Sequence, residues 1–185
     1  SVRLAEEDCL RKGITSFEDA GTTVAELQDF INLADHQDLN LRLWMMINDS
    51  YDHISDVAGQ YPKLNIGGQH YLTVRAVKAY IDGALGSFGA WLLAPYADKP
   101  GFVGQNTTKI EDLERMANLC IDNNLQYCIH AIGDRANREV IDMNQRTFEA
   151  HPDQHDLRWR IEYAQHIDTA DIPRFHQLGI IAAMQ

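Results

Sequence analysis

Two polar side chains, Lys78 and His130, each stand near the end of an apolar, strand-like stretch and just before a glycine-containing turn. Lys78 lies in the run VKAYIDGALGS and His130 in the run IHAIGDRAN. In an α/β barrel, the residues at the C-terminal ends of the strands carry the chemistry. A lysine on one such strand and a histidine on the next indicate metal-dependent hydrolysis.

Each of these residues also has a simpler interpretation. A lysine inside an apolar strand is costly to bury, so Lys78 either reaches solvent from the strand end or serves as a metal ligand or catalytic amine. Asp82 could neutralise that lysine or begin a turn with Gly83. His130 is either a hydrogen-bonded structural residue or a metal ligand. Asp134 could be the N-cap of the helix that follows.

A third group of polar residues closes the next strand, with Glu162 and Tyr163 followed by His166. His166 could be a metal ligand, a residue that donates a hydrogen bond to a metal ligand, or a surface residue. It lies three positions after Tyr163, so in a regular strand the two side chains point to opposite faces. Nucleophile motifs such as G-x-S-x-G are absent from the sequence.

The elements that would position these residues alternate between strand and helix. Apolar runs predict six strands, at 14–18, 41–47, 74–81, 125–131, 158–164 and 180–184. Thr23 and Glu26 have capping-box spacing at the start of a helix. Alternation of this kind predicts a parallel sheet, either doubly wound or a (β/α)8 barrel. No G-x-G-x-x-G turn follows the first strand, so a dinucleotide-binding fold has little support.

One long segment, residues 83–107, contains Pro95, Pro100 and several glycines among large apolar residues. Loops of this length inside a compact domain are usually functional. We therefore predict that this segment is a loop that shapes a binding pocket.

Composition narrows the range of partners. The net charge of −11 is spread along the 185 residues, which argues against nucleic acid and against an anionic membrane surface. No apolar run approaches the roughly 20 residues that span a bilayer. The three cysteines form no CxxC pair, which is typical of reduced, buried thiols. We expect a cytoplasmic protein.

Several stretches together resemble the amidohydrolase superfamily, in particular the family 3 branch that includes N-substituted formamide deformylase-like proteins. The matching stretches, in the family's order, are GITSFEDAG, VKAYIDGALGS, HAIGDRAN, RWRIEYAQHI and LGIIAAMQ. The resemblance implies a metal-dependent (β/α)8 TIM barrel that uses metal-activated water to hydrolyse an amide, formamide or related C–N bond. One or two divalent ions, with zinc the first candidate, would be the cofactor.

The same resemblance implies roles for individual residues. Lys78 matches the fourth-strand lysine, which in the family is often carboxylated, and His130 matches the fifth-strand histidine; both would hold metal. We assign Asp82, Tyr163 and His166 to substrate binding. No H-x-H motif occurs in the sequence, and Tyr163 stands where the family has a histidine. The general-base aspartate of the family's last strand is expected outside this chain.

On this alignment the chain, 1–185, is a single partial barrel domain that covers strands two to seven of eight. We expect such a piece to be inactive alone and to associate with the rest of its chain or as a homo-oligomer. The expected substrate is a small amide-type molecule. The alternative is a non-catalytic or regulatory barrel homologue that has lost a metal ligand.

Overall fold

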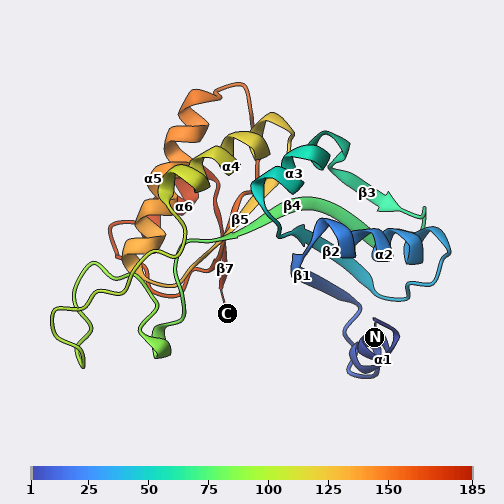
Figure 1. Ribbon diagram of the computed structural model, residues 1–185, viewed down its shortest axis with the longest axis horizontal. Coiled ribbons are helices and arrows are strands. Elements are labelled where there is room, and N and C mark those ends of the chain that lie inside the picture. Colours follow the sequence, from blue (N-terminus) through green and yellow to red (C-terminus); the bar gives the residue numbers. More distant parts are fainter. Residues whose placement is uncertain (1, 185) are drawn as a thin grey trace. The chain divides into compact units, whose positions relative to one another are not determined.

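The computed structural model describes residues 2–184, in which strands and helices alternate along most of the chain (Figure 1). The strands are β1 (Ser16–Thr22), β2 (Arg42–Ile47), β3 (Lys63–Ile66), β4 (Leu72–Tyr80), β5 (Gln126–Ala131), β6 (Arg160–Tyr163) and β7 (Ile181–Met184). The helices are α1 (Val2–Arg11), α2 (Val24–Asp35), α3 (Tyr51–Val57), α4 (Ile110–Asp122), α5 (Asp134–Ala150) and α6 (Ile172–Leu178), with short 3-10 turns η1 (Ala58–Gln60) and η2 (Leu85–Ser87).

The strand order confirms an α/β fold of the barrel type. The strands follow one another as β1-β2-β4-β5-β6-β7, and β1 with β2, β2 with β4, β5 with β6 and β6 with β7 pair in parallel. A doubly wound sheet would reverse its order at an internal switch point, and this order does not reverse. The last residue of the LGIIAAMQ stretch, Gln185, lies outside the described residues.

Two details differ from the predictions. β3 was not predicted; it pairs antiparallel with β4, and its four residues are too few to show a period. The first strand was predicted to end at Glu18, but β1 continues to Thr22. Pairing with β2 explains the extension, because Asp19 lies opposite Met45 and Thr22 opposite Ile47, across an irregularity in register.

Contacts between residues group into two compact units, one up to Val77 and one from Lys78 onward. β4 contributes Leu72–Val77 to the first unit and its last three residues to the second. In the first unit the predicted capping box is confirmed. Thr23 Oγ1 accepts a hydrogen bond from Glu26 N, and the Glu26 carboxylate accepts one from Thr23 N.

The second unit is built on β5, every residue of which is buried. Helices α4 and α5 both contact this strand, and α6 contacts α5 (Figure 1). In this unit Trp159 is fully buried, and the rings of Tyr127 and Phe148 pack edge-on against its ring. Its indole N–H donates to Leu125 O, so this bulky side chain is both packed and hydrogen-bonded. All of the candidate site residues lie in this unit.

The segment 83–107 is held down by its own contacts. Gly83 and Gly89 are joined by a backbone hydrogen bond, and Thr107 N donates to Ile81 O at the other end of the segment. Tyr96 packs with Ala90 and Ile132, and its hydroxyl donates to Ala90 O. The segment therefore forms an ordered wall. Its predicted part in a binding pocket stays a prediction.

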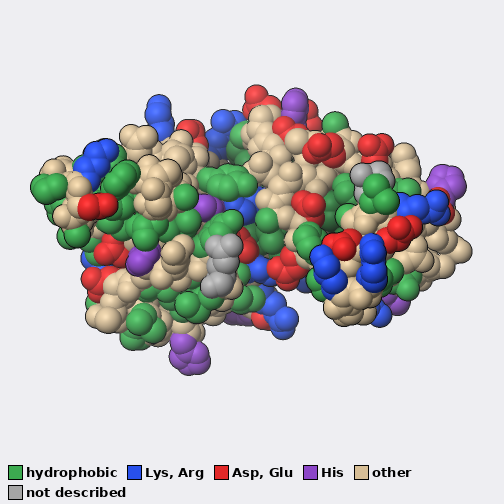
Figure 2. Space-filling model, turned by 90° about the horizontal axis from the view of Figure 1, so that it is seen from below, with side chains coloured by type: hydrophobic (Ala, Val, Ile, Leu, Met, Phe, Trp, Pro, Cys, Tyr) green, Lys and Arg blue, Asp and Glu red, His purple; other side chains and the backbone are tan. Residues whose placement is uncertain are grey.

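Charged side chains on the face shown in Figure 2 are interspersed, with lysines and arginines lying among aspartates and glutamates. That face carries no broad basic patch of the kind that binds nucleic acid. Among the described residues, no helix is long and apolar enough to cross a membrane.

Gly133 provides a test of how closely the segment packs on the turn after β5. A Cβ at this position would lie 2.0 Å from the carbonyl oxygen of Trp91, and backbone cannot yield as a side chain can. We predict that Gly133→Ala lowers the free energy of unfolding by about 1–3 kcal/mol, the usual cost of overpacking. Chemical denaturation of the protein that carries this chain measures the change.

Gly86→Ala is the matched control, because a Cβ at Gly86 meets nothing within 4 Å. It should leave the free energy of unfolding nearly unchanged. Equal unfolding midpoints for the two variants would show that the turn and the segment do not pack as described.

Candidate active site at the ends of β4, β5 and β6

Lys78 lies inside β4 with 4% of its surface exposed, so it does not reach solvent from the strand end. Its Nζ lies 3.5 Å from the centroid of the Tyr80 ring and donates a hydrogen bond to Ala79 O. Burial lowers the pKa of Lys78 to about 8, and the charge of Glu162 opposes this shift. At pH 7 about a tenth of the amine is therefore uncharged, far more than for an ordinary lysine.

His130 lies near the end of β5 and packs between two tyrosine rings. Its ring centroid is 5.3 Å from that of Tyr80 and 4.6 Å from that of Tyr163. Neither ring nitrogen makes a well-formed hydrogen bond with a described residue, and Nε2 lies 3.5 Å from Asp82 Oδ1. Burial, helped by the charge on Lys78, lowers the pKa of His130 to about 4. The imidazole is therefore neutral at pH 7 and can offer a lone pair.

Tyr80 shows how the structure brings Lys78 and His130 together, because its ring contacts both. It lies two residues after Lys78, on the same face of β4. Sequence analysis did not single it out. The i, i+2 spacing of alternating strand residues was the signal that could have found it.

Asp82 is buried and accepts three backbone hydrogen bonds. Oδ1 accepts from Ile132 N at 3.0 Å, and Oδ2 accepts from Trp91 N at 2.9 Å and from Gly133 N at 2.8 Å. Burial raises the pKa of Asp82, and the three N–H groups oppose the rise. The carboxylate therefore ties the end of β4 to the wall segment and to the turn after β5. A direct contact of Asp82 with substrate stays a prediction.

At the end of β6, Glu162 lies opposite His130 in the strand register. Its carboxylate accepts two hydrogen bonds from Arg160, from Nε at 2.7 Å and from Nη2 at 3.2 Å. Both side chains are largely buried, and they form an ion pair without net charge beside the candidate ligands. Tyr163 follows with a left-handed backbone, φ = 74°.

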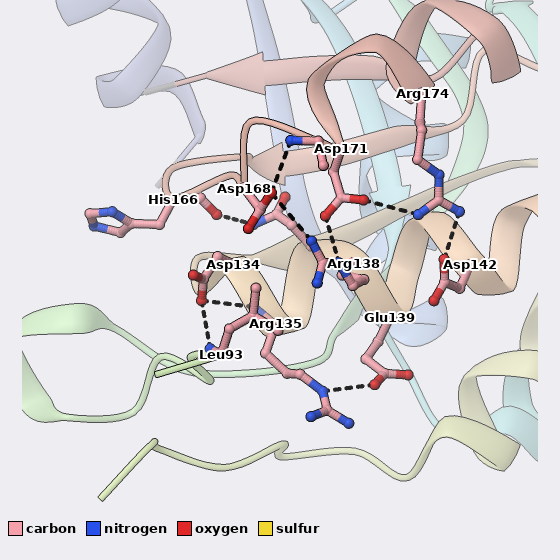
Figure 3. A network of polar contacts seen from close by, with 12 residues as sticks. Leu93, Asp134, Arg135, Arg138, Glu139, Asp142, His166, Asp168, Asp171 and Arg174 are labelled. Carbon is pink, nitrogen blue, oxygen red and sulfur yellow. Dashed lines mark hydrogen bonds and ion pairs between the residues drawn. The ribbon is translucent and has the colours of Figure 1, made fainter. Parts of the chain in front are cut away.

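His166 does not join the other candidate residues through its side chain. Its backbone N donates to Ile132 O, and its backbone O accepts from Asn137 Nδ2. The side chain is exposed, and Figure 3 shows the imidazole pointing away from the surrounding polar network. Of the three interpretations left open by the sequence, a surface residue fits this position best.

The network in Figure 3 anchors the connection after β6 to helix α5. Arg138 Nε donates to Asp171 at 2.8 Å, and Arg174 donates to Asp171 and to Asp142. Asp134 was considered as an N-cap, but the N-cap is Gly133 and Asp134 is the first helical residue. Its Oδ1 instead accepts from Leu93 N and Arg135 N, which joins the wall segment to α5.

The side chains of the candidate site could supply some, but not all, of the ligands of a metal ion. His130 offers buried ring nitrogens without a hydrogen-bond partner and a neutral imidazole, which is the form that binds metal. Within residues 2–184, however, no three histidine, cysteine, aspartate or glutamate side chains are grouped so as to hold an ion. Lys78 and His130 are thus candidate ligands of an incomplete set.

Comparison with solved structures defines the class to which this fold belongs. An uncharacterized metal-dependent hydrolase from Pyrococcus horikoshii superimposes with a TM-score of 0.80 and 25% identity, over 98% of this chain and 35% of the other. A second, from Pyrococcus furiosus, gives a TM-score of 0.80 at 21% identity. The chain has the α/β fold of part of a metal-dependent hydrolase TIM barrel.

The sequence itself places the chain more narrowly. The family model described as "Amidohydrolase family" matches residues 1–185, and the chain belongs to this family. Protein LONG AFTER FAR-RED 3 of Arabidopsis thaliana is 33% identical over 98% of the chain. The putative amidohydrolase YtcJ of Bacillus subtilis is 26% identical over all of it. The chain spans 32% and 34% of the lengths of these two relatives.

The use of both Asp82 oxygens leads to a prediction. In Asp82→Asn an amide NH2 group replaces one acceptor and faces a backbone N–H, so at least one buried donor loses its partner. We expect the free energy of unfolding to fall by about 1–3 kcal/mol. Denaturant titration of the protein that carries this chain measures it.

Asp134→Asn is the control, because Asp134 uses only Oδ1 for its two backbone hydrogen bonds and an asparagine oxygen can accept both. It should cost much less. If both variants lose the same stability, the three hydrogen bonds to Asp82 do not hold the site together.

Proposed function

We propose that this chain is part of a metal-dependent amidohydrolase that cleaves an amide, formamide or related C–N bond of a small molecule. The observation that carries the proposal is the neutral, buried His130, whose ring nitrogens make no well-formed hydrogen bond with a described residue. It lies beside a buried lysine whose pKa is lowered toward neutrality. Membership of the amidohydrolase family supports the reaction class.

Lys78 and His130 are the residues of this chain that would hold the metal. The neutral amine of Lys78 can add to carbon dioxide, which forms an N–C bond, releases one proton and gives a carbamate with two oxygen donors. His130 offers a ring nitrogen without first losing a proton. When bound, a divalent metal such as zinc lowers the pKa of water and polarises a carbonyl group.

Other parts of the chain would receive the substrate. Tyr163 lies beside His130 and also packs against the wall segment, so it lies where an amide group could meet the site. Asp82 holds that wall in place, and His166 contributes its backbone to the same connection. The remaining ligands and the general-base aspartate would come from outside this chain. We propose a cytoplasmic enzyme that associates with the rest of the barrel or as a homo-oligomer.

A second function, that of a non-catalytic barrel homologue with a binding or regulatory role, is favoured by one observation. Tyr163 lies against His130, and a neutral phenol hydroxyl is a poorer metal ligand than an imidazole nitrogen. A site that has lost one ligand would hold metal weakly.

Metal content separates these two functions. For the protein that carries this chain, purified without chelator, we expect about one or two equivalents of a divalent metal. We also expect chelator-sensitive hydrolysis of simple formamides or amides. His130→Ala should lower the metal content measured by elemental analysis, because it removes one of the ligands.

His176→Ala is the control, since His176 is an exposed residue on α6, apart from the candidate ligands. It should keep the wild-type metal content. A wild-type protein without metal, and unable to bind added zinc, would contradict the enzyme and favour the non-catalytic homologue.

The lowered pKa of Lys78 gives a pH dependence. Carbamate formation needs the uncharged amine, and the pKa of Lys78 is about 8, whereas an ordinary lysine titrates near about 10.4. Raising the pH through about 8 should therefore increase the carbamate signal from isotope-labelled bicarbonate in the NMR spectrum. Lys78→Met should abolish that signal. A signal that rises only near about pH 10 would show that Lys78 has the pKa of an ordinary, solvent-exposed lysine.

A further inference from the structure

Tyr163 occupies a backbone conformation that side-chain-bearing residues rarely adopt. Its φ is 74°, and that of the next residue, Ala164, is 40°. For a bulky residue such values are true outliers, and outliers of this kind cluster at functional sites. β6 ends at this point, beside the candidate ligand His130.

The strand register shows what this conformation changes. Tyr163 lies opposite Ala131, and Glu162 lies opposite His130. In a regular strand Tyr163 would share the face of Ala131 and point away from the face of His130. The Tyr163 ring nevertheless lies edge-on to the His130 ring, with centroids 4.6 Å apart and an interplanar angle of 61°.

Tyr163 also contacts an apolar cluster formed by the wall segment and the turn after β5. Tyr163 packs against the cluster of Ala90, Tyr96 and Ile132. Tyr96 is fixed within this cluster by its hydrogen bond to Ala90 O. The Tyr163 ring thus contacts this cluster as well as the His130 ring.

Hydrogen bonding orients the His130 ring only weakly, through a backbone contact at Gly83 and a 3.5 Å approach of Nε2 to Asp82 Oδ1. A histidine that binds metal usually donates its second ring nitrogen to a carboxylate or a carbonyl, which fixes the plane of the ring. At His130 neither nitrogen makes a well-formed hydrogen bond with a described residue. Its closest ring contacts are the aromatic rings of Tyr163 and Tyr80.

We propose that Tyr163 is a positioning residue. The left-handed backbone at the end of β6 brings its ring against His130, and the ring holds the imidazole in the orientation that presents a ring nitrogen to metal. This rests on the proposed function only for the metal. The ring contact itself is independent of it. The role belongs to the aromatic ring of Tyr163, and the phenol oxygen takes no part as a ligand.

Two substitutions separate the ring from the hydroxyl. Tyr163→Phe keeps the ring and removes the oxygen, and Tyr163→Leu removes the ring but keeps an apolar side chain. We expect Tyr163→Phe to bind zinc within about twofold of wild type. We expect Tyr163→Leu to bind zinc about tenfold or more weakly, as when the support of a metal ligand is lost. Competition titration of the full-length protein measures both affinities.

A second measurement does not need metal. NMR of selectively labelled histidine in the metal-free, full-length protein, with His130 assigned by His130→Gln, reports the ring environment and tautomer of His130. The signals should be kept in Tyr163→Phe and shifted in Tyr163→Leu. Phe148→Leu, which removes an aromatic ring that packs on Trp159 outside the wall cluster, is the control for general loosening and should leave the His130 signals near their wild-type positions.

Several results would overturn the proposal. Equal loss of zinc affinity in Tyr163→Phe and Tyr163→Leu would assign the role to the hydroxyl. Unchanged His130 signals in Tyr163→Leu would show that the ring does not hold the imidazole, and shifts as large in Phe148→Leu would assign the effect to loosening. If wild type binds no zinc but the His130 signals behave as expected, the proposed function fails while the positioning role stands.

Discussion

The buried carboxylate of Asp82 is the interaction on which the site depends. Its two oxygens accept backbone N–H groups from three places, one in the wall segment and two in the turn after β5. Burying a carboxylate is costly, and three hydrogen bonds offset that cost while fixing the geometry of all three donors. The end of β4, the wall segment and the end of β5 therefore form one rigid corner, and Lys78 and His130 lie on the two strands that meet there.

Burial also decides the chemistry of the two candidate ligands. Lys78 lies against the ring of Tyr80, and His130 lies beside the rings of Tyr80 and Tyr163. At these buried positions a positive charge loses its hydration. Each is shifted toward its uncharged form, and the uncharged forms are those that react with carbon dioxide or bind metal. The Arg160–Glu162 pair lies next to them with its charges compensated. The same burial that stabilises the sheet thus prepares both donors.

The small number of candidate ligands agrees with the share of its relatives' length that the chain covers. The chain covers about a third of the lengths of its relatives, and it contains two candidate donors, Lys78 and His130. Parallel strands place chemistry-bearing residues at one edge, and each strand supplies only one or two of them. A metal site divided among many strands is therefore divided along the whole length of the sequence.

The sequence by itself determined the alternation of strand and helix, the parallel sheet, the capping box at Thr23, and Lys78 and His130 as the residues to examine. These follow from local patterns, because apolar periodicity and capping depend on neighbours within a few positions. Only the tertiary structure decided that Lys78 is buried, that Asp82 binds three backbone groups, that Tyr163 turns onto His130 and that the imidazole of His166 points away. Each of these depends on residues tens of positions apart, or on a backbone conformation that composition does not reveal.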